Sequence, residues 1–230
     1  MQAFTKLSSD FHELLQTVHH IRKTEKGTFL FQEGTPSLEL YIVLSGKVQI
    51  GKMMPDGREL TIRMCSVGDL IGELSLFYAA NQHTLNAKVI EGGEVAVIHK
   101  TELEEKLSQS HAASIEFMKW MSHQHRKTQI KFRDLVLYGK KGALYSTLIR
   151  LSNSYGIKCE DGIIINTPLT NQDIANFCGT SREVINRLLS ELRKNKIISM
   201  DKGIITIHDL EFLRLEIDCE HCSNDICNVE

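Results

Sequence analysis

Three of the six cysteines in this chain lie within nine residues of one another, as Cys219, Cys222 and Cys227. Their C-x2-C-x4-C spacing gathers three thiolates, which are soft ligands suited to zinc or to an iron–sulfur cluster. The remaining cysteines are scattered, each in an apolar or turn segment, and we expect structural roles for them. They are Cys65, Cys159 and Cys178.

Spacing alone leaves the bound metal open. Zinc is the alternative to an iron–sulfur cluster, because His221 could complete a Cys3His set. However, His221 lies between two cysteines spaced for a single chelate loop, which would strain simultaneous ligation of one ion. The third alternative is a disulfide or a purely structural role for the three cysteines.

The segment TNQDIANFCGTSREVINRLLSELRKNKIIS, which begins at Thr170, is typical of a helix-turn-helix. A Thr-x-x-acid helix start occurs twice, at Thr170 with Asp173 and at Thr180 with Glu183, and a Cys-Gly pair lies between the two. This order predicts a short helix, a tight glycine turn and a longer helix. Beyond them, residues 197–200 and 204–207 flank an Asp-Lys-Gly turn, which predicts a β-hairpin wing.

The second helix of such a motif enters the major groove of double-stranded DNA, with its N-terminal residues at base edges. One face of the predicted helix is apolar, at Val184, Leu188 and Leu192, and the opposite face is polar. On that polar face Arg187 can bond guanine O6 and N7, and Glu183 can accept from a cytosine amino group. The alternative is an ordinary solvated helix face. The predicted DNA-binding residues are Thr180, Ser181, Arg182, Glu183, Asn186 and Arg187.

The chain has 230 residues, which is enough for two domains that each bury a core. Its hydrophobic fraction of 42% and charged fraction of 24% are typical of a globular protein. It contains no apolar run of about 18 residues, and its N-terminus lacks the pattern of a secretory signal, so we expect a cytoplasmic protein with no membrane span. No paired carboxylates and no Ser–His or Cys–His set can be recognised, which argues against an enzyme.

The net charge of −2 conceals two opposite local biases. Residues 115–158 contain nine Lys and Arg against only Glu116 and Asp134, whereas residues 209–230 contain seven acids against only Arg214. A basic DNA-binding face balanced by an acidic tail fits this distribution. Solvated helix faces would explain the charges equally well.

Residues from about 24 to 100 are predicted to be β structure. Nine of the 15 glycines lie there, between short β-branched or apolar segments at 28–31, 40–44, 47–50, 60–64 and 94–98. Regular short strands with glycine turns favour a compact antiparallel barrel or jelly roll.

Helical patterns follow over residues 114–138 and 141–153, and a turn segment over 156–168. In the first helix, residues at spacings of three or four form a seam that could face the same helix of a second chain. The alternative is that this helix packs on its own β domain. The seam residues are Ile115, Met118, Met121, His125, Thr128, Phe132 and Leu135.

The order of β domain, long helix and winged helix-turn-helix resembles the Crp/Fnr superfamily over nearly the whole chain. Residues 71–77, IGELSLF, look like its effector-loop signature, and REVINR at 182–187 is similar to its E-x-x-S-R recognition pattern, with Asn186 in place of serine. The resemblance implies an α+β fold with an N-terminal antiparallel β-roll (1–110), a long dimerisation helix (111–140), a C-terminal winged helix-turn-helix (141–217) and a tail (218–230). It also implies a homodimeric transcription regulator that binds a palindromic TGTGA-like site and works with RNA polymerase.

Members of this superfamily that bind a cyclic nucleotide carry an Arg-Ser or Arg-Thr pair about ten residues beyond the Gly-Glu of the effector loop. His83 and Thr84 occupy the corresponding positions here. A neutral imidazole is a poor substitute for a bidentate guanidinium. The resemblance therefore implies that a cyclic nucleotide is not the signal.

The cysteine-rich tail is similar to that of the Bacillus-type Fnr group, and no cysteine precedes Cys65. That similarity implies a [4Fe-4S] cluster with three cysteines and one aspartate, and it selects Asp134, the only acid between Glu116 and Glu160, as the fourth ligand. The alternative for Asp134 is an ordinary salt bridge at a helix end, with Arg133 or Lys131.

The implied function is oxygen-sensing control of anaerobic genes. The cluster would join the tail to the long helix and fix the orientation of the recognition helices, and oxygen would destroy it. The alternative function is that of a zinc-stabilised regulator of the same superfamily, which responds to a small molecule in the β-roll.

Overall fold

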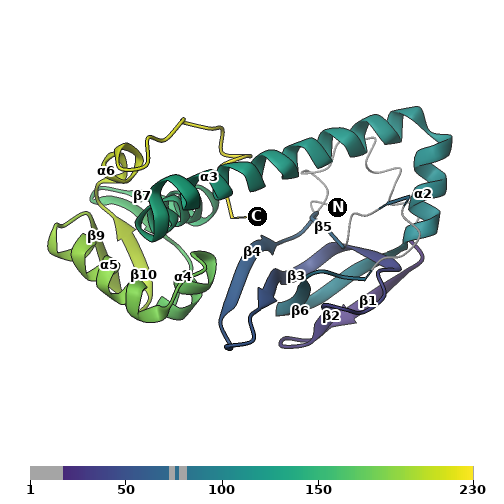
Figure 1. Cartoon of the computed structure of the whole chain (residues 1–230), viewed down its shortest axis with the longest axis horizontal. Helices are drawn as coiled ribbons and strands as arrows, with labels where there is room; N and C mark the ends of the chain where they lie inside the picture. Colours follow the sequence, from purple (N-terminus) through teal and green to yellow (C-terminus); the bar gives the residue numbers. More distant parts are fainter. Residues whose placement is uncertain (1–17, 73–75, 78–81, 230) are drawn as a thin grey trace. The chain divides into compact units, whose positions relative to one another are not determined.

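The computed structural model describes residues 18–72, 76–77 and 82–229 of the chain (Figure 1). Two compact units are present. The first comprises the described residues up to Met53 together with Ile62–Ser122, and the second comprises Met54–Thr61 together with the described residues from His123 onward.

The first unit is built on a six-stranded sheet, in which β1, β6, β3 and β4 are neighbours in that order, while β2 pairs with β6 and β5 with β3. The β1–β6, β2–β6, β3–β6 and β3–β5 pairs are antiparallel, which confirms the predicted antiparallel β domain. The strands are β1 (His20–Thr24), β2 (Phe29–Phe31), β3 (Glu39–Met53), β4 (Glu59–Cys65), β5 (Leu70–Ile71) and β6 (Asn86–His99).

Two strands predicted at 40–44 and 47–50 are one continuous strand, β3. The pairing register between β3 and β6 shifts on both sides of Gly46, whose φ of +86° is accessible mainly to glycine. A Cβ there would meet the backbone oxygen of Glu91. The glycine therefore allows a bulge within a strand rather than a turn between two strands.

The first unit continues with α2 (Lys100–Gln109) and the start of α3 (His111–Tyr155), and α3 from His123 onward belongs to the second unit. A break at Gly139, with φ 58° and ψ −152°, divides α3 and confirms the two helices predicted over 114–138 and 141–153. The start of α3 packs Phe117 on the apolar core of its own β domain, with Trp120 and Met121 beside it. At the start of α3 the structure therefore confirms the alternative prediction, that this helix packs on its own β domain.

Other seam positions of α3 remain exposed in the single chain. The exposed fraction is 58% for Met118, 68% for Phe132 and 45% for Leu135, and the adjacent Val136 and Leu137 are also exposed. Large apolar side chains at helical spacing, left uncovered on a long helix, are what a helix–helix interface requires.

The second unit contains the helix-turn-helix. It begins, after α3, with the strands β7 (Gly156–Cys159) and β8 (Gly162–Ile165). The helices α4 (Asn171–Phe177) and α5 (Arg182–Lys194) come next. They are followed by β9 (Ile198–Asp201), β10 (Ile204–Ile207) and α6 (Leu210–Leu215). The four strands form one sheet in the order β7-β8-β10-β9. The predicted β9–β10 wing is confirmed. The prediction that residues 156–168 form only a turn is wrong, because β7 and β8 pair as a hairpin and extend the wing sheet.

Helix caps position the helix-turn-helix. The predicted capping box of α4 is confirmed, because the Thr170 side chain accepts from the Asp173 N–H and Asp173 accepts from the Thr170 N–H. The predicted start of α5 is displaced by one residue: Ser181, not Thr180, is the N-cap and accepts from the Val184 N–H. The buried face of α5 is Ile185, Leu188, Leu189 and Leu192, with Val184 half-buried.

None of the helices in the described residues combines the length and the apolarity that a membrane crossing needs.

Candidate metal centre and nucleic-acid interface

The cysteine-bearing tail is held against the second unit. Cys227 is 8% exposed, and Cys219 and Cys222 are half-buried against the apolar core of the helix-turn-helix. Asn153, near the end of α3, donates from Nδ2 to the carbonyl oxygen of Cys227 over 2.6 Å, and the Val229 N–H donates to Ser154. The structure thus brings all three tail cysteines onto one domain surface.

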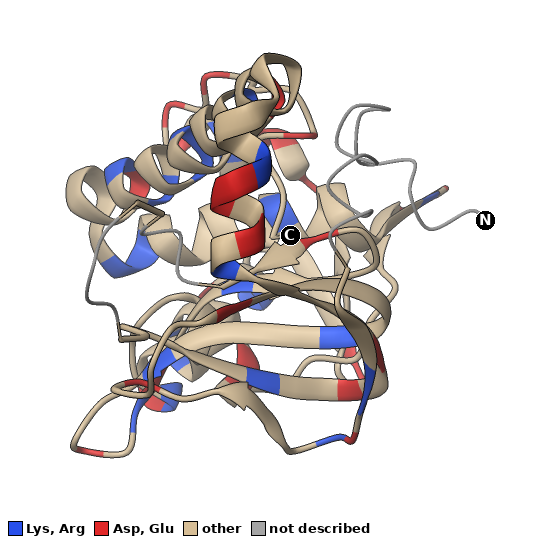
Figure 2. Cartoon of the chain, turned by 90° about the vertical axis from the view of Figure 1, so that its right-hand side faces the viewer, with Lys and Arg blue, Asp and Glu red and all other residues tan. Residues whose placement is uncertain are grey.

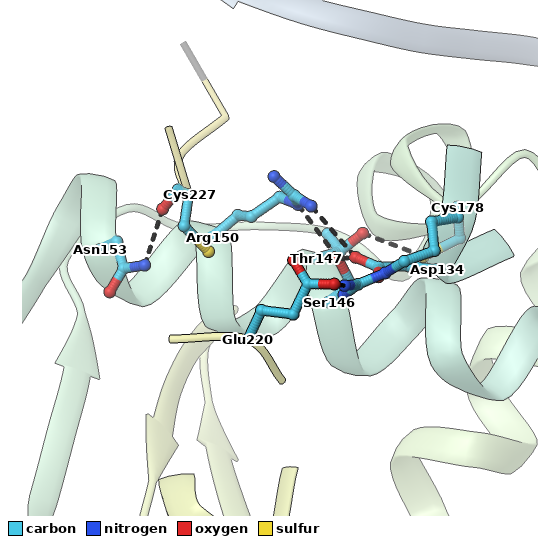
Figure 3. Close-up of polar contacts among 9 residues, drawn as sticks. Asp134, Ser146, Thr147, Arg150, Asn153, Cys178, Glu220 and Cys227 are labelled. Carbon is cyan, nitrogen blue, oxygen red and sulfur yellow. Dashed lines mark hydrogen bonds and ion pairs between the residues drawn. The ribbon is translucent and has the colours of Figure 1, made fainter. Parts of the chain in front are cut away.

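Asp134 lies buried on α3, with an exposed fraction of 2%. Its Oδ2 accepts from the Ser146 hydroxyl over 2.5 Å and from Arg150 Nη2 over 3.1 Å, while its Oδ1 accepts from Arg133 Nη2 over 2.8 Å (Figure 3). Arg133 also forms an ion pair with Glu220 of the tail. The predicted Arg133 salt bridge is present, but it is one part of a buried network rather than an exposed pair at a helix end.

Arg150 is the buried cation of this network. Its side chain is 3% exposed, and its Nη1 is a buried donor with no partner among the described residues. Figure 3 shows the side chain extending from the helix between Cys227 and Asp134. A buried guanidinium with a spare donor is costly unless negative charge lies beside it.

The surroundings of Cys227 raise the pKa of its thiol. Burial raises the pKa of this thiol, the Arg150 guanidinium opposes the increase, and negative charge on Cys219, Cys222 and Asp134 adds to it. By contrast, burial raises the pKa of the Cys178 thiol to about 12, as expected for an inert structural cysteine.

The donor atoms of the tail's described residues do not converge on one point. A tetrahedral zinc site with Zn–S bonds of about 2.3 Å needs sulfurs about 3.8 Å apart. In residues 18–72, 76–77 and 82–229, no three of Cys219, His221, Cys222 and Cys227 bring their ligand atoms within 4.8 Å of one another. Soft thiolates suit both zinc and an iron–sulfur cluster.

Sequence reasoning did not find Arg150 or Ser146. The signal for Arg150 was a charged residue directly between Ile149 and Leu151 in an apolar helix. A guanidinium in that position needs a buried partner, and the acid at Asp134 is the residue that supplies it.

The polar face of α5 is available to a ligand. Arg182, Glu183, Asn186 and Arg187 are all exposed, as predicted. Asn186 accepts a hydrogen bond from the Asn171 side chain of α4, so its amide is held in place. Thr180 differs from the other predicted DNA-binding residues, because its side chain is only 5% exposed.

A groove of about 800 Å³ borders this face. The start of α4, the start of α5 and the wing line it, with Thr170, Arg182 and Lys202 among the lining residues. Two cations and a helix N-terminus on one groove are suited to the phosphate backbone of a nucleic acid.

The predicted effector region of the first unit contains a buried aromatic stack. His83 is 3% exposed and its ring lies 3.7 Å from that of Phe31, nearly parallel to it. Both border a groove of about 550 Å³, whose described lining includes Glu39 and no Lys or Arg. Glu73, Leu74 and Ser75 of the effector-loop signature lie outside the described residues.

Comparison with known proteins agrees with this architecture. Residues 21–110 match the cyclic nucleotide-binding domain family, and residues 142–216 match the Crp-like helix-turn-helix domain family. The chain is 54% identical to the anaerobic regulatory protein of Bacillus subtilis over 97% of this chain and 94% of that protein. It is 28% identical to a CRP-like cAMP-activated global transcriptional regulator of Mycobacterium tuberculosis, over 82% of this chain and 84% of that protein.

Among solved structures, the c-di-GMP-responsive global regulator CLP of Xanthomonas campestris has the same fold. The TM-score is 0.73 at 22% identity, and the match covers 87% of this chain and 99% of that one. Two matched domains in the expected order, and a relative that is 54% identical along nearly its whole length, establish the family. The chain belongs to the Crp/Fnr family of DNA-binding transcription regulators, whose members are not enzymes.

Proposed function

We propose that this protein is an oxygen-responsive regulator of anaerobic gene expression, controlled by a [4Fe-4S] cluster that Cys219, Cys222, Cys227 and Asp134 hold. The observation that carries the proposal is the buried network of Asp134 with Arg150 and Arg133, which Arg133 joins to Glu220 of the cysteine-bearing tail. The 54% identity to a protein named anaerobic regulatory protein supports the anaerobic role. Its direct test is the metal content and absorption spectrum of protein purified without air.

The proposed ligands come from two segments that are distant in the sequence. Asp134 belongs to α3 before the Gly139 break, whereas the cysteines follow α6. When bound, the cluster supplies an oxygen-labile link between these segments. In its absence the tail keeps only weaker ties, among them the Asn153 and Arg133 contacts. Arg150 remains with Asp134 and keeps the buried carboxylate compensated.

Asp134 continues directly into the exposed apolar stretch of α3 at Leu135, Val136 and Leu137. A tail that is fixed to Asp134 therefore acts on the part of the helix that we propose to face the second chain of a homodimer. In a dimer, the orientation of this helix sets the separation of the two copies of α5, and the two half-sites must lie about one helical turn apart. Oxygen control then operates as a shift between competent and incompetent arrangements.

We propose the following partners on the same basis. The exposed face of α5 reads double-stranded DNA at a palindromic TGTGA-like site, with Arg187 and Glu183 at base edges. Ser181 and Thr180 contribute at the helix start, where backbone N–H groups favour phosphate. RNA polymerase is the second protein partner, and the cytoplasm is the site of action.

Replacing Arg187 with alanine should weaken operator binding by roughly 1–3 kcal/mol and relax the preference at one base pair. The reason is that its exposed guanidinium lies on the α5 face that would enter the major groove. A mobility-shift titration against operators that vary at each position measures both effects. Arg193→Ala, an exposed arginine in the last turn of α5, is the matched control. Unchanged specificity in Arg187→Ala would remove Arg187 from the readout.

Micromolar cyclic AMP should leave operator affinity unchanged. His83 occupies the position of the expected phosphate-binding arginine, and the structure buries it in a stack on Phe31. Isothermal titration of the full chain with cyclic AMP checks this result. Tight binding, with a dissociation constant in the micromolar range, would contradict it.

A further inference from the structure

A second group of metal-ligating side chains lies in the first unit, well separated in sequence from the tail. The imidazoles of His19 and His99 have ring centroids 4.3 Å apart, and His19 Nδ1 lies 3.9 Å from a carboxylate oxygen of Glu102. One ligand atom from each of these residues lies within 4.8 Å of the other two. Among the described residues, this is the only such trio of His, Cys, Asp or Glu.

The backbone fixes all three side chains at one junction of the fold. His19 directly precedes β1, and its N–H donates to the Val97 carbonyl of β6 over 2.9 Å. His99 ends β6, and Glu102 lies in the first turn of α2. Figure 2, which views the molecule from the side of α2, shows acidic and basic residues along this helix. The three donors therefore come from the adjoining ends of β1, β6 and α2.

The donors are not committed to structural roles that would exclude a metal. His99 is the N-cap of α2, but its side chain makes no capping hydrogen bond. The nearby ammonium group of Lys100 pairs with Glu104, at 3.7 Å, rather than with Glu102. The side chains of His19 and Glu102 are about half exposed, so that an ion can enter from solvent and keep a water ligand.

We propose that His19, His99 and Glu102 bind one divalent transition-metal ion of the zinc type. Two neutral imidazoles and one carboxylate form a His2Glu set, and such sets bind zinc with a fourth position open to water. Metal–ligand bonds of about 2.0–2.1 Å require ligand atoms about 3.4 Å apart, and His19 Nδ1 and the Glu102 carboxylate oxygen are 3.9 Å apart. The bound ion ties the segment before β1 to the start of α2, and so stabilises the first unit by linkage.

Zinc titration of the metal-free chain tests the site. Because thiolates are good zinc ligands in general, the titration uses full-length protein in which Cys219, Cys222 and Cys227 are replaced with serine. We expect one zinc ion per chain, and a melting temperature that rises with zinc concentration. Co²⁺ bound in its place should show visible d–d bands without the thiolate-to-metal absorption that sulfur ligands produce.

Three single substitutions in this serine background determine which side chains bind the zinc ion. His99→Ala and Glu102→Gln should each weaken zinc binding by more than about tenfold, because each removes a direct ligand. His20→Ala is the matched control: this exposed neighbour of His19 lies outside the trio and should leave affinity unchanged. In the chain with its tail cysteines intact, His99→Ala should lower bound zinc by one ion per chain. No zinc binding in the serine background, or full binding after His99→Ala, would overturn the proposal.

Discussion

Cys227→Ser is expected to abolish the iron–sulfur cluster and, with it, the difference in DNA binding between protein kept without air and protein exposed to air. Cys227 is the most deeply buried of the three tail thiols and has Arg150 as a neighbouring positive charge. Serine is nearly isosteric but supplies no thiolate, and two cysteines cannot hold the group in place of three. Iron and sulfide content, with the mobility shift of an operator, measure the two effects.

Cys159→Ser is the control for this prediction. Cys159 is an exposed cysteine of the β7–β8 hairpin in the same unit, so its removal changes thiol number without touching the tail. We expect it to retain both the cluster and the oxygen response. A Cys227→Ser protein with the parental iron content would show that the tail is not the site.

Asp134→Ala is expected to act twice, and the two effects can be separated. In the protein without metal it leaves the Arg150 guanidinium buried and without its carboxylate, which should lower the free energy of unfolding by roughly 3–5 kcal/mol. In the loaded protein it also removes the proposed fourth ligand, so the cluster should be lost or bound at much lower occupancy. Denaturant titration without metal, and iron content after anaerobic purification, report the two effects independently.

The double variant Asp134→Ala/Arg150→Met distinguishes a ligand from a structural carboxylate. Removing both charges takes away the buried, uncompensated guanidinium, so much of the lost stability should return. The cluster should not return, because no oxygen donor is restored at position 134. Recovery of stability together with full cluster occupancy would mean that Asp134 serves Arg150 alone.

Two further variants test the identity of the fourth ligand. Asp134→Cys keeps an ionisable donor at this position and should yield a cluster that persists longer in air, because thiolate is a softer ligand for iron than carboxylate. His221→Ala should keep cluster occupancy, oxygen lability and DNA response, since His221 is exposed. If the cluster is instead lost in His221→Ala and retained in Asp134→Ala, His221 is the fourth ligand. The cluster then does not link the tail to α3.

The helix-turn-helix could be predicted from the sequence because its determinants are local. The capping box at Thr170, the glycine turn and the apolar spacing of α5 each act over a few residues, and the structure reproduces them. The one-residue displacement of the α5 cap from Thr180 to Ser181 is of the same local kind: two adjacent hydroxyl residues compete, and the one that can accept from the third N–H of the helix becomes the cap.

The network around Asp134 could not be predicted from local pattern. Asp134 and Arg150 lie on opposite sides of the Gly139 break, and the break decides which faces of the two helical segments meet. Residues 142–151, in the helix predicted over 141–153, are buried all round, and only tertiary packing determines that. The β7 strand was not predicted, because every residue in it is exposed and no alternation of buried and exposed residues marks it as a strand.

The absorption spectrum and metal content of the chain, purified and kept without air, test the central claim most directly. Our account predicts brown protein with broad absorption near 400 nm, about four iron and four sulfide per chain, and loss of the colour on exposure to air. Colourless protein that carries zinc, or no metal, on Cys219, Cys222 and Cys227 would contradict it.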